Sequence, residues 1–353
     1  MRPDILLRRP SHVPQKARFP VIDAHNHLFA DMPAGEMTAV MDEVGVRIFV
    51  NLTGNCVLPF DDKGYTIRRR DLGVYDRGWV KAKPGRFASF TMAEFARWDD
   101  FTLDLDAGFA DQCVAALEAD VKKGALGLKV TKELGLRFHA PDGAMIAVDD
   151  ARLSPIWKRA GELGLPVLIH TSDPVGFFLP VDERNEHLST LRTYPGWSFH
   201  GSHFKKGELL EQRTRMMAAH PRTTFICAHV ANNPEDLDWV SALLDSMPNV
   251  NVDFSARMDE LGRQPYTARD FFLRFQDRVV FGSDMPISTA MYRAYFRFLE
   301  TRDEYFDYPG YLGETDNLTR WKIYGLDLPD KALEKIYFRN ALRIIPGLKG
   351  LWK

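Results

Sequence analysis

The sequence has few cysteines, no long apolar run and no excess of one charge, and each of these absences excludes a class of protein. Its three cysteines, Cys56, Cys113 and Cys227, are odd in number and far apart. This pattern argues against a disulfide framework and predicts small core residues in a reducing compartment. No run of about 18 apolar residues is present, so we expect no membrane span. The N-terminal residues lack the apolar core of a signal peptide, which predicts a cytoplasmic protein, with a removed leader as the alternative.

Acidic and basic residues nearly balance, with a formal net charge of -2 and a pI near 6.6. This balance gives no reason to expect nucleic acid or a membrane as a partner, and we expect a small-molecule substrate instead. With 353 residues, of which 45% are hydrophobic and 27% charged, the chain has the composition of a globular protein with a large core.

Short apolar runs with β-strand character recur along the chain, mostly with helical patterns between them. We expect eight strands, at 21–28, 47–52, 86–92, 125–131, 165–170, 223–229, 249–255 and 278–283. Helical patterns lie at 35–44, 107–123, 209–219 and 234–247. This alternation predicts an α/β fold, a single (β/α)8 TIM barrel with long βα loops. The barrel is expected over residues 20–346, after an irregular N-terminal arm at 1–19 and before a C-terminal tail at 347–353.

Side chains that can bind a metal or move a proton stand at the ends of four of these strands. The first strand holds His25 and His27, and side chains two positions apart on a strand project from the same face. Later strands end in His170, His229 and Asp284. In a TIM barrel the C-terminal strand ends meet at the active site, so we expect these residues to come together. Imidazole and carboxylate are typical zinc ligands, although each residue alone could be a core histidine or a helix cap.

These motifs resemble the metal-dependent amidohydrolase superfamily. The resemblance rests on the His-x-His of the first strand, the histidines ending the fifth and sixth strands, and the Gly-Ser-Asp ending the eighth. The segments Val-Phe-Gly-Ser-Asp-Met-Pro and Ile-Cys-Ala-His are most similar to its amidohydrolase-2 branch. That branch includes the aminocarboxymuconate-semialdehyde and resorcylate decarboxylases and some lactonases. The resemblance spans nearly the whole chain and implies a fold and a metal site, but no particular substrate.

The resemblance also implies roles for individual residues. His25, His27, His170 and Asp284 become ligands of one divalent ion, with Zn2+ favoured and Mn2+, Fe2+ and Co2+ also compatible. Asp284 and His229 become catalytic residues, because Asp284 is placed to take a proton from a metal-activated water and His229 to polarise the substrate or shuttle a proton. By analogy with the branch, a homodimer is also expected.

Two more residues have alternative interpretations. Lys129, in Gly-Leu-Lys-Val, resembles the lysine that is carbamylated and bridges two metals in binuclear members, so its carbamylation would add a second metal. We favour a free ammonium that pairs with a substrate anion, and a structural pair with Asp23 or Asp284 is the third interpretation. Arg257 has the planar fork that suits a substrate carboxylate, with a surface ion pair to an acidic neighbour as the alternative.

We therefore expect a metal-dependent hydrolase in which a metal-activated water cleaves a small amide, lactone or ester. The main alternative is a metal-dependent non-oxidative decarboxylase, a lyase, that acts on a small carboxylated substrate. A third is a barrel that binds a metal or ligand without turnover. Long loops at 53–78, 172–207 and 286–330 are expected to form the rim of the pocket.

Overall fold

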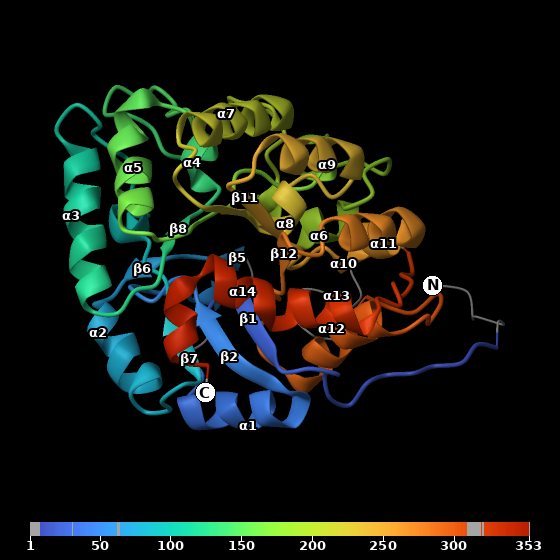
Figure 1. Ribbon diagram of the computed structural model, residues 1–353. Helices are drawn as coiled ribbons and strands as arrows, with labels where there is room; N and C mark the ends of the chain where they lie inside the picture. The colour runs from blue at the N-terminus through green and yellow to red at the C-terminus, as the bar shows by residue number, and fades with distance from the viewer. Residues whose placement is uncertain (1–7, 30, 62–63, 309–318, 320, 353) are drawn as a thin grey trace.

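The computed structural model describes residues 8–29, 31–61, 64–308, 319 and 321–352. Parallel strands occupy its centre and helices surround them (Figure 1). One sheet contains, in spatial order, β1 (Val21–Asn26), β2 (Val46–Asn51) and β7 (Phe87–Ser89). The other contains β12 (Val279–Val280), β11 (Val250–Asp253), β10 (Phe225–Cys227), β9 (Val167–Ile169) and β8 (Leu128–Val130). Each of the eight predicted runs overlaps one of these strands, and only β2 begins outside its run, one residue earlier.

The two sheets meet at both pairs of edges through backbone hydrogen bonds. Beside β7 and β8, the N–H of Lys129 donates to the carbonyl of Thr91 at 2.8 Å. Beside β12 and β1, the N–H groups of Ser283 and Asp284 both donate to the carbonyl of His25, at 3.0 and 2.8 Å. The strands follow one another around the barrel, so the TIM-barrel prediction is confirmed, and the second contact sets Asp284 beside His25.

Helices cover the outside of the strands (Figure 1). The four predicted helical patterns correspond to α1 (Ala34–Val44), α3 (Phe109–Lys122), α7 (Lys206–Ala219) and α9 (Leu237–Ser246). The other long helices are α5 (Ser154–Glu162), α11 (Pro265–Arg274) and α12 (Thr289–Glu300). Shorter helices are α2 (Leu72–Tyr75), α4 (Glu133–Leu136), α6 (Leu188–Thr193), α8 (Ala228–Ala231), α10 (Met258–Gly262), α13 (Asp330–Glu334) and α14 (Asn340–Ile344). Among the described residues, no helix has the length and apolar character needed to cross a membrane.

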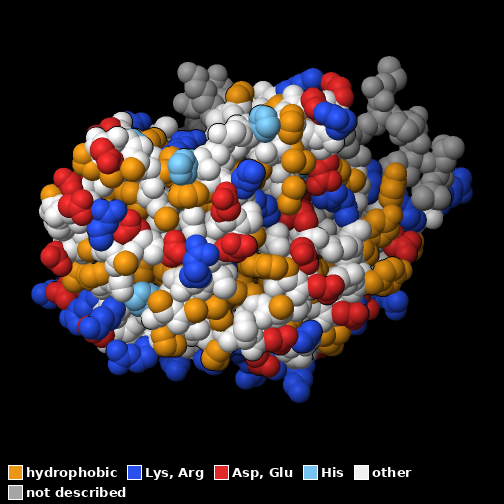
Figure 2. Space-filling model, turned by 90° about the horizontal axis from the view of Figure 1, so that it is seen from above, with side chains coloured by type: hydrophobic (Ala, Val, Ile, Leu, Met, Phe, Trp, Pro, Cys, Tyr) orange, Lys and Arg blue, Asp and Glu red, His pale blue; other side chains and the backbone are white. Residues whose placement is uncertain are grey.

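The main core lies between the strands and the helices. On α12, Met291, Tyr295 and Leu299 recur at helical spacing and are completely buried, which fixes the side of the helix that faces the barrel. The three cysteines are buried free thiols, as expected from the sequence. On the face shown in Figure 2, acidic and basic side chains are interspersed with small apolar areas, which agrees with the balanced composition.

Two small antiparallel pairs lie in the loop that follows β2. They are β3 (Cys56–Val57) with β6 (Arg68–Arg69), and β4 (Phe60–Asp61) with β5 (Gly64–Tyr65). Residues 8–19, in the predicted N-terminal arm, form neither helix nor strand, and residues 1–7 lie outside the described part. At the other end, Trp352 of the predicted tail stacks on Phe338, with ring centroids 5.0 Å apart.

Candidate active site

A cavity of about 100 Å³ lies at the C-terminal ends of the strands. Its lining includes six of the residues singled out in the sequence, namely His27, Lys129, His170, His229, Arg257 and Asp284. The predicted rim loops contribute Leu58, Tyr65, Ile67, Asp173, Phe177, Trp197 and Pro286. Residues 309–318 and 320 of the third rim loop lie outside the described part. The barrel thus brings candidate side chains from distant parts of the chain around one pocket.

His25 is oriented by Asp253, the last residue of β11. Its Nδ1 lies 2.8 Å from Oδ2 of Asp253, and both side chains are fully buried. Burial raises the pKa of Asp253, but attraction to His25 and hydrogen bonds from His25 and Ser255 outweigh it and lower that pKa to about 2. Because a carboxylate only accepts, Nδ1 of His25 carries the hydrogen. Nε2 lies 3.3 Å from the ammonium of Lys129, which only donates, so Nε2 keeps its lone pair.

His27 is oriented by Thr53, which lies two residues after the end of β2. Its Nδ1 lies 3.1 Å from Oγ1 of Thr53, and that hydroxyl donates its hydrogen to Oδ1 of Asn51 at 3.1 Å. The hydroxyl therefore accepts from Nδ1, which leaves the lone pair on Nε2. Burial lowers the pKa of His27 well below its usual range, so the ring is neutral at pH 7.

His229 begins an unusual left-handed turn after β10. From His229 to Asn232 the backbone φ angles are 57°, 55°, 52° and 54°, a region that L-residues seldom occupy and that is costly for β-branched Val230. The buried side chain of Arg213 supports the turn by donating to the carbonyl of Ala231 at 2.9 Å. Strain held in this way is typical of functional sites.

Like His25, His229 carries its hydrogen on Nδ1. Nδ1 lies 2.7 Å from the carbonyl oxygen of Ser255, which can only accept, so Nε2 again keeps the lone pair. Burial lowers the pKa of His229 well below its usual range. Nε2 is buried and has no hydrogen-bond partner among the described residues.

The Nε2 atoms of these three histidines face one carboxylate. Nε2 of His27 lies 3.4 Å from Oδ1 of Asp284, and Nε2 of His25 and His229 lie 3.6 and 3.5 Å from its Oδ2. Lone pairs on neutral imidazoles and carboxylate oxygens repel one another unless a cation lies between them. Burial raises the pKa of Asp284, partly offset by attraction to His25 and Lys129.

The donor atoms of His25, His27 and Asp284 all lie within 4.8 Å of one another. Neutral imidazoles with a carboxylate suit a divalent metal ion, and the unpartnered Nε2 of His229 beside them supports the same interpretation. These residues therefore fit the divalent metal ion that the family resemblance implies.

His170 follows β9 directly and lies against His229, with ring centroids 4.4 Å apart. Its Nε2 lies 2.7 Å from the carbonyl oxygen of Ser172 and 3.3 Å from Oδ1 of Asp173, so Nδ1 is the nitrogen with a free lone pair. Burial lowers the pKa of His170 to about 3. Within the described residues, two groups of side chains could hold a metal, His25 with His27 and Asp284, and His25 with His229 and Asp253. His170 is in neither group, and its role as a metal ligand stays a prediction.

Lys129 lies in β8 and is almost fully buried. Its Nζ lies 3.3 Å from Nε2 of His25, and burial lowers its pKa to about 8. The described side chains show no ion pair of Lys129 with Asp23 or Asp284. Instead, Asp23 accepts hydrogen bonds from the hydroxyl groups of Ser283 and Tyr292, at 2.5 and 2.8 Å.

Arg257 is buried at the pocket wall, so the alternative of a surface ion pair is wrong. Nη2 of Arg257 lies 3.3 Å from Oδ1 of Asp173, and Nη1 donates to the carbonyl of Ala256 at 2.7 Å. Asp173 also pairs with Lys132, a second cation of the pocket wall. Although burial raises the pKa of Asp173, Lys132 and His170 outweigh it and hold that pKa well below its usual range.

Sequence reasoning missed Asp253, Lys132 and Asp173. Asp253 ends a strand, as the predicted histidines do, so the same strand-end pattern was available to find it. Lys132 follows Lys129 by three positions, and Asp173 follows His170 by three, but nothing in the sequence shows that these two side chains pair.

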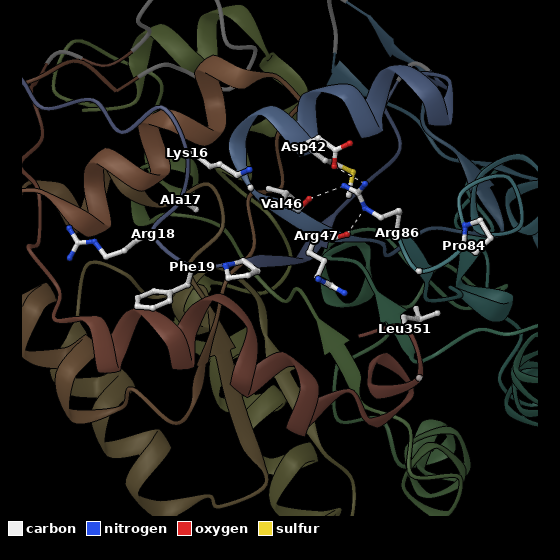
Figure 3. Close-up of a pocket in the computed structure, with 15 residues that line it drawn as sticks. Lys16, Ala17, Arg18, Phe19, Asp42, Val46, Arg47, Pro84, Arg86 and Leu351 are labelled. Atoms are coloured by element: carbon white, nitrogen blue, oxygen red, sulfur yellow. Dashed lines mark hydrogen bonds and ion pairs between the residues drawn. The ribbon is translucent and has the colours of Figure 1, made fainter. Parts of the chain in front are cut away.

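A larger cavity of about 830 Å³ lies at the opposite end, where the strands begin (Figure 3). Arg86 closes part of it by donating to the carbonyls of Arg47 and Val46, at 2.8 and 3.1 Å, and by pairing with Asp42 at 2.7 Å. In TIM barrels this end serves stability rather than catalysis. The smaller cavity, which holds the titratable cluster, is therefore the candidate active site.

The fold and this cluster define a TIM-barrel protein with histidines and a carboxylate at the C-terminal strand ends. The chain belongs to the amidohydrolase family, whose model matches residues 22–347. The predicted relationship to the amidohydrolase-2 branch is thereby confirmed. No curated protein matches the sequence.

Several solved structures share the fold at low sequence identity. An uncharacterised TIM-barrel protein from Bordetella bronchiseptica is 16% identical, with a TM-score of 0.55 over 94% of this chain and 100% of the other. A 2,6-dihydroxybenzoate decarboxylase from Rhizobium is 16% identical, with a TM-score of 0.53 over 94% and 99%. A dihydroxybenzoic acid decarboxylase from Polaromonas sp. JS666, with bound manganese, is 15% identical, with a TM-score of 0.52 over 93% and 97%.

Proposed function

We propose that this protein is a metal-dependent hydrolase that cleaves a small amide, lactone or ester. The observation that carries the proposal is the convergence of three Nε2 lone pairs, from His25, His27 and His229, on the carboxylate of Asp284. Such a set suits one divalent ion, for which zinc is favoured by the nitrogen and oxygen donors. Manganese in the Polaromonas decarboxylase supports a divalent metal of this kind, and iron and cobalt are compatible.

When bound, such an ion would lower the pKa of a water molecule and polarise a substrate carbonyl. Asp284, which is 19% exposed and lines the pocket, would take the proton from the attacking water and return it to the leaving group. Ser255 holds the hydrogen of His229 on Nδ1, so the Nε2 lone pair of His229 faces the carboxylate of Asp284 and is available to the ion. Apolar side chains of the rim, including Phe177 and Trp197, limit the entry of bulk water.

Lys129 favours a site with one ion. Its ammonium contacts Nε2 of His25, and a metal on that lone pair would displace this contact and free Nζ for a substrate anion. Carbamylation would instead turn Lys129 into a ligand for a second ion. The pKa of about 8 leaves the ammonium as the main form at neutral pH, and this form binds an anion, although the share of neutral amine that can be carbamylated is larger than for an ordinary lysine.

A decarboxylase is the second candidate, because one specific observation favours it. Three cations line the pocket, Lys129, Lys132 and Arg257, together with the aromatic side chains of Phe29, Tyr65, Phe177 and Trp197. Such a wall suits a carboxylated ring, and the named decarboxylases share this fold. In that reaction Asp284 or His229 would deliver a proton to the carbon that loses carbon dioxide.

The first test is metal content per chain, measured by elemental analysis on protein purified without chelator and again after incubation with zinc and bicarbonate. One equivalent supports the single-ion site with free Lys129, and two would indicate a carbamylated Lys129. No bound metal, even after reconstitution, would contradict the proposal and leave a non-catalytic barrel.

The second test separates the two reactions by their products. Metal-loaded protein is incubated with a panel of lactones, esters and amides, and with a panel of hydroxylated benzoic acids. Release of acid or amine from the first panel supports hydrolysis. Carbon dioxide from the second panel, without activity on the first, would replace the hydrolase by the decarboxylase.

A further inference from the structure

We propose that Lys132 determines specificity by binding an anionic group of the substrate away from the reacting end. The pocket would then take a small substrate with a second anionic group, most simply a dicarboxylate. This inference rests on the proposed function for the place of the reaction, but it is independent of whether hydrolysis or decarboxylation occurs there.

The argument begins with Lys206, a buried lysine that is fully satisfied. Its Nζ donates to the carbonyls of Asp173 and Asn232, at 2.8 and 2.6 Å, and lies 3.4 Å from Oε2 of Glu235. An ammonium has three hydrogens, so these three acceptors use all of them. Lys206 does not line the pocket, and its contacts account for its burial.

Lys132 is buried to a similar degree, 6% exposed against 9% for Lys206, but it has fewer acceptors. Among the described residues, its Nζ contacts one acceptor, Oδ2 of Asp173. It also lies over the rings of Phe199 and Trp197, at 5.2 and 5.9 Å from their centroids. Two aromatic faces stabilise an ammonium partly, but they accept no strong hydrogen bond. In the described part of the chain, Lys132 therefore has N–H groups left to donate to a ligand in the pocket that it lines.

The negative charge of Asp173 is shared, so it does not neutralise this end of the pocket. Oδ2 contacts Lys132, while Oδ1 lies 3.3 Å from both His170 and Arg257. The residues that line the pocket include three cations and two carboxylates, Asp173 and Asp284. An anionic ligand group beside Lys132 would use its remaining donors and reduce the excess positive charge.

Among the described residues, Lys132 makes no hydrogen bond or ion pair with a member of the potential metal-binding groups, and it is linked to them through Asp173 and His170. It pairs with Asp173 and faces the rim residues Trp197 and Phe199, whereas the potential metal ligands His25, His27 and Asp284 form their own group. One anionic or carbonyl group of the substrate would therefore lie near that group, and a second would lie near Lys132. The cavity volume of about 100 Å³ limits both to a small molecule.

Fumarate and fumaramate test this inference, because they have the same shape and fumaramate replaces one carboxylate by a neutral amide. Both keep a carboxylate for a metal site. Dissociation constants are measured by isothermal titration with full-length, zinc-incubated protein whose metal content is determined in the same samples. We expect fumarate to bind about tenfold more tightly than fumaramate, the usual effect of a charge-assisted hydrogen bond.

Three variants assign the preference to a residue. Lys132→Gln keeps a donor for Asp173 but removes the charge, and it should bind the two probes equally. Lys132→Arg should restore the preference for fumarate. The control is Lys123→Gln, which removes a lysine charge outside the pocket, paired with Asp71, and should keep the preference of the wild type.

A preference that survives in Lys132→Gln, or that is absent from metal-loaded wild-type protein, would overturn the role of Lys132. The metal measurement keeps this result separate from the proposed function. If the protein binds no metal yet prefers fumarate through Lys132, the inference stands and the metal-dependent function fails. If metal is bound and neither probe is preferred, the inference fails and the metal site stands.

Discussion

His25 and Asp253 are joined by a buried hydrogen bond of 2.8 Å, although 228 positions separate them in the chain. They lie on β1 and β11, with β12 between these strands. The second oxygen of Asp253 accepts from the backbone N–H of His229 at 3.0 Å. One carboxylate therefore orients both histidines whose Nε2 atoms face Oδ2 of Asp284.

We predict that Asp253→Asn weakens metal binding while the fold is retained. The amide oxygen can still accept from His229, but the amide nitrogen would then face Nδ1 of His25 and favour the tautomer with its hydrogen on Nε2. Loss of such an orienting partner typically reduces metal affinity about 10- to 100-fold. Zinc affinity is measured by competition with a chromogenic chelator. The control is Asp259→Asn, a buried aspartate outside the potential metal-binding groups. Equal zinc affinity in both variants would contradict the role of Asp253.

Asp284→Asn should separate metal binding from turnover. The amide can still present an oxygen to the ion, so we expect most of the metal to remain, but it cannot take a proton. Loss of a general base lowers kcat about 10²- to 10⁴-fold. His25→Ala and His27→Ala should instead lose the metal, and exposed His203→Ala should change neither property. Near-normal turnover by Asp284→Asn on a confirmed substrate would show that another residue carries the proton.

The barrel and the convergence of the site could be predicted because both depend on local patterns. The alternation of strands and helices gives the parallel barrel, and barrel geometry places strand-end residues at one end. His25 and Asp284 were found in this way, and closure between β12 and β1 sets them side by side. All the predicted strands except the second were longer than the observed ones, because the runs continue into loops whose apolar residues are also buried.

The orientations of individual rings and the pairing of charges could not be predicted. Which nitrogen of His170 is free depends on a carbonyl two residues later, in a loop whose path no periodic pattern fixes. The pairing of Lys132 with Asp173 joins two βα loops and depends on the same undetermined backbone. Arg257 was expected to contact either a substrate or the surface, whereas its contact with Asp173 follows from burial of the loop after β11.

Gly282→Ala should destabilise the protein and weaken the metal site together. A Cβ at position 282 would lie 2.5 Å from Cβ of His25 and 3.2 Å from its Cα, so β1 and β12 would have to move apart. Overpacking of this kind typically costs about 1–3 kcal/mol. Chemical denaturation measures the free energy of unfolding, and chelator competition measures zinc affinity.

Gly207→Ala is the control, because its new Cβ in α7 would meet no atom within 4 Å. It should be neutral or stabilising by about 0.5–1 kcal/mol. If Gly282→Ala matched this control, the close contact between β12 and β1 at Gly282 and His25 would be disproved.

Docking of the N-terminal arm should depend on pH through Asp303. The backbone N–H and the ring Nδ1 of His12 each lie 2.7 Å from its carboxylate, and Nε of Arg297 lies 2.6 Å away. Burial raises the pKa of Asp303, but these contacts outweigh it and lower the pKa below the usual value. The ionised form is therefore the stabilised one, and its contribution is complete above the ordinary aspartate pKa of about 3.9. As the pH falls through the lower pKa of the folded state, protonation removes this contribution and the arm should detach.

The measurement is hydrogen exchange of residues 8–18 at several pH values between neutral and acid. In the wild type we expect protection at neutral pH and loss of protection in acid, before the barrel strands lose theirs. Asp303→Asn should show weak, pH-independent protection of the arm, because its amide cannot be ionised. Asp330→Asn is the control, since this more exposed aspartate pairs with Arg18 of the same arm and screening by water makes the pair weaker. If the arm stayed protected at all pH values in Asp303→Asn, its docking would depend on other contacts, such as those of Arg9 with Tyr305.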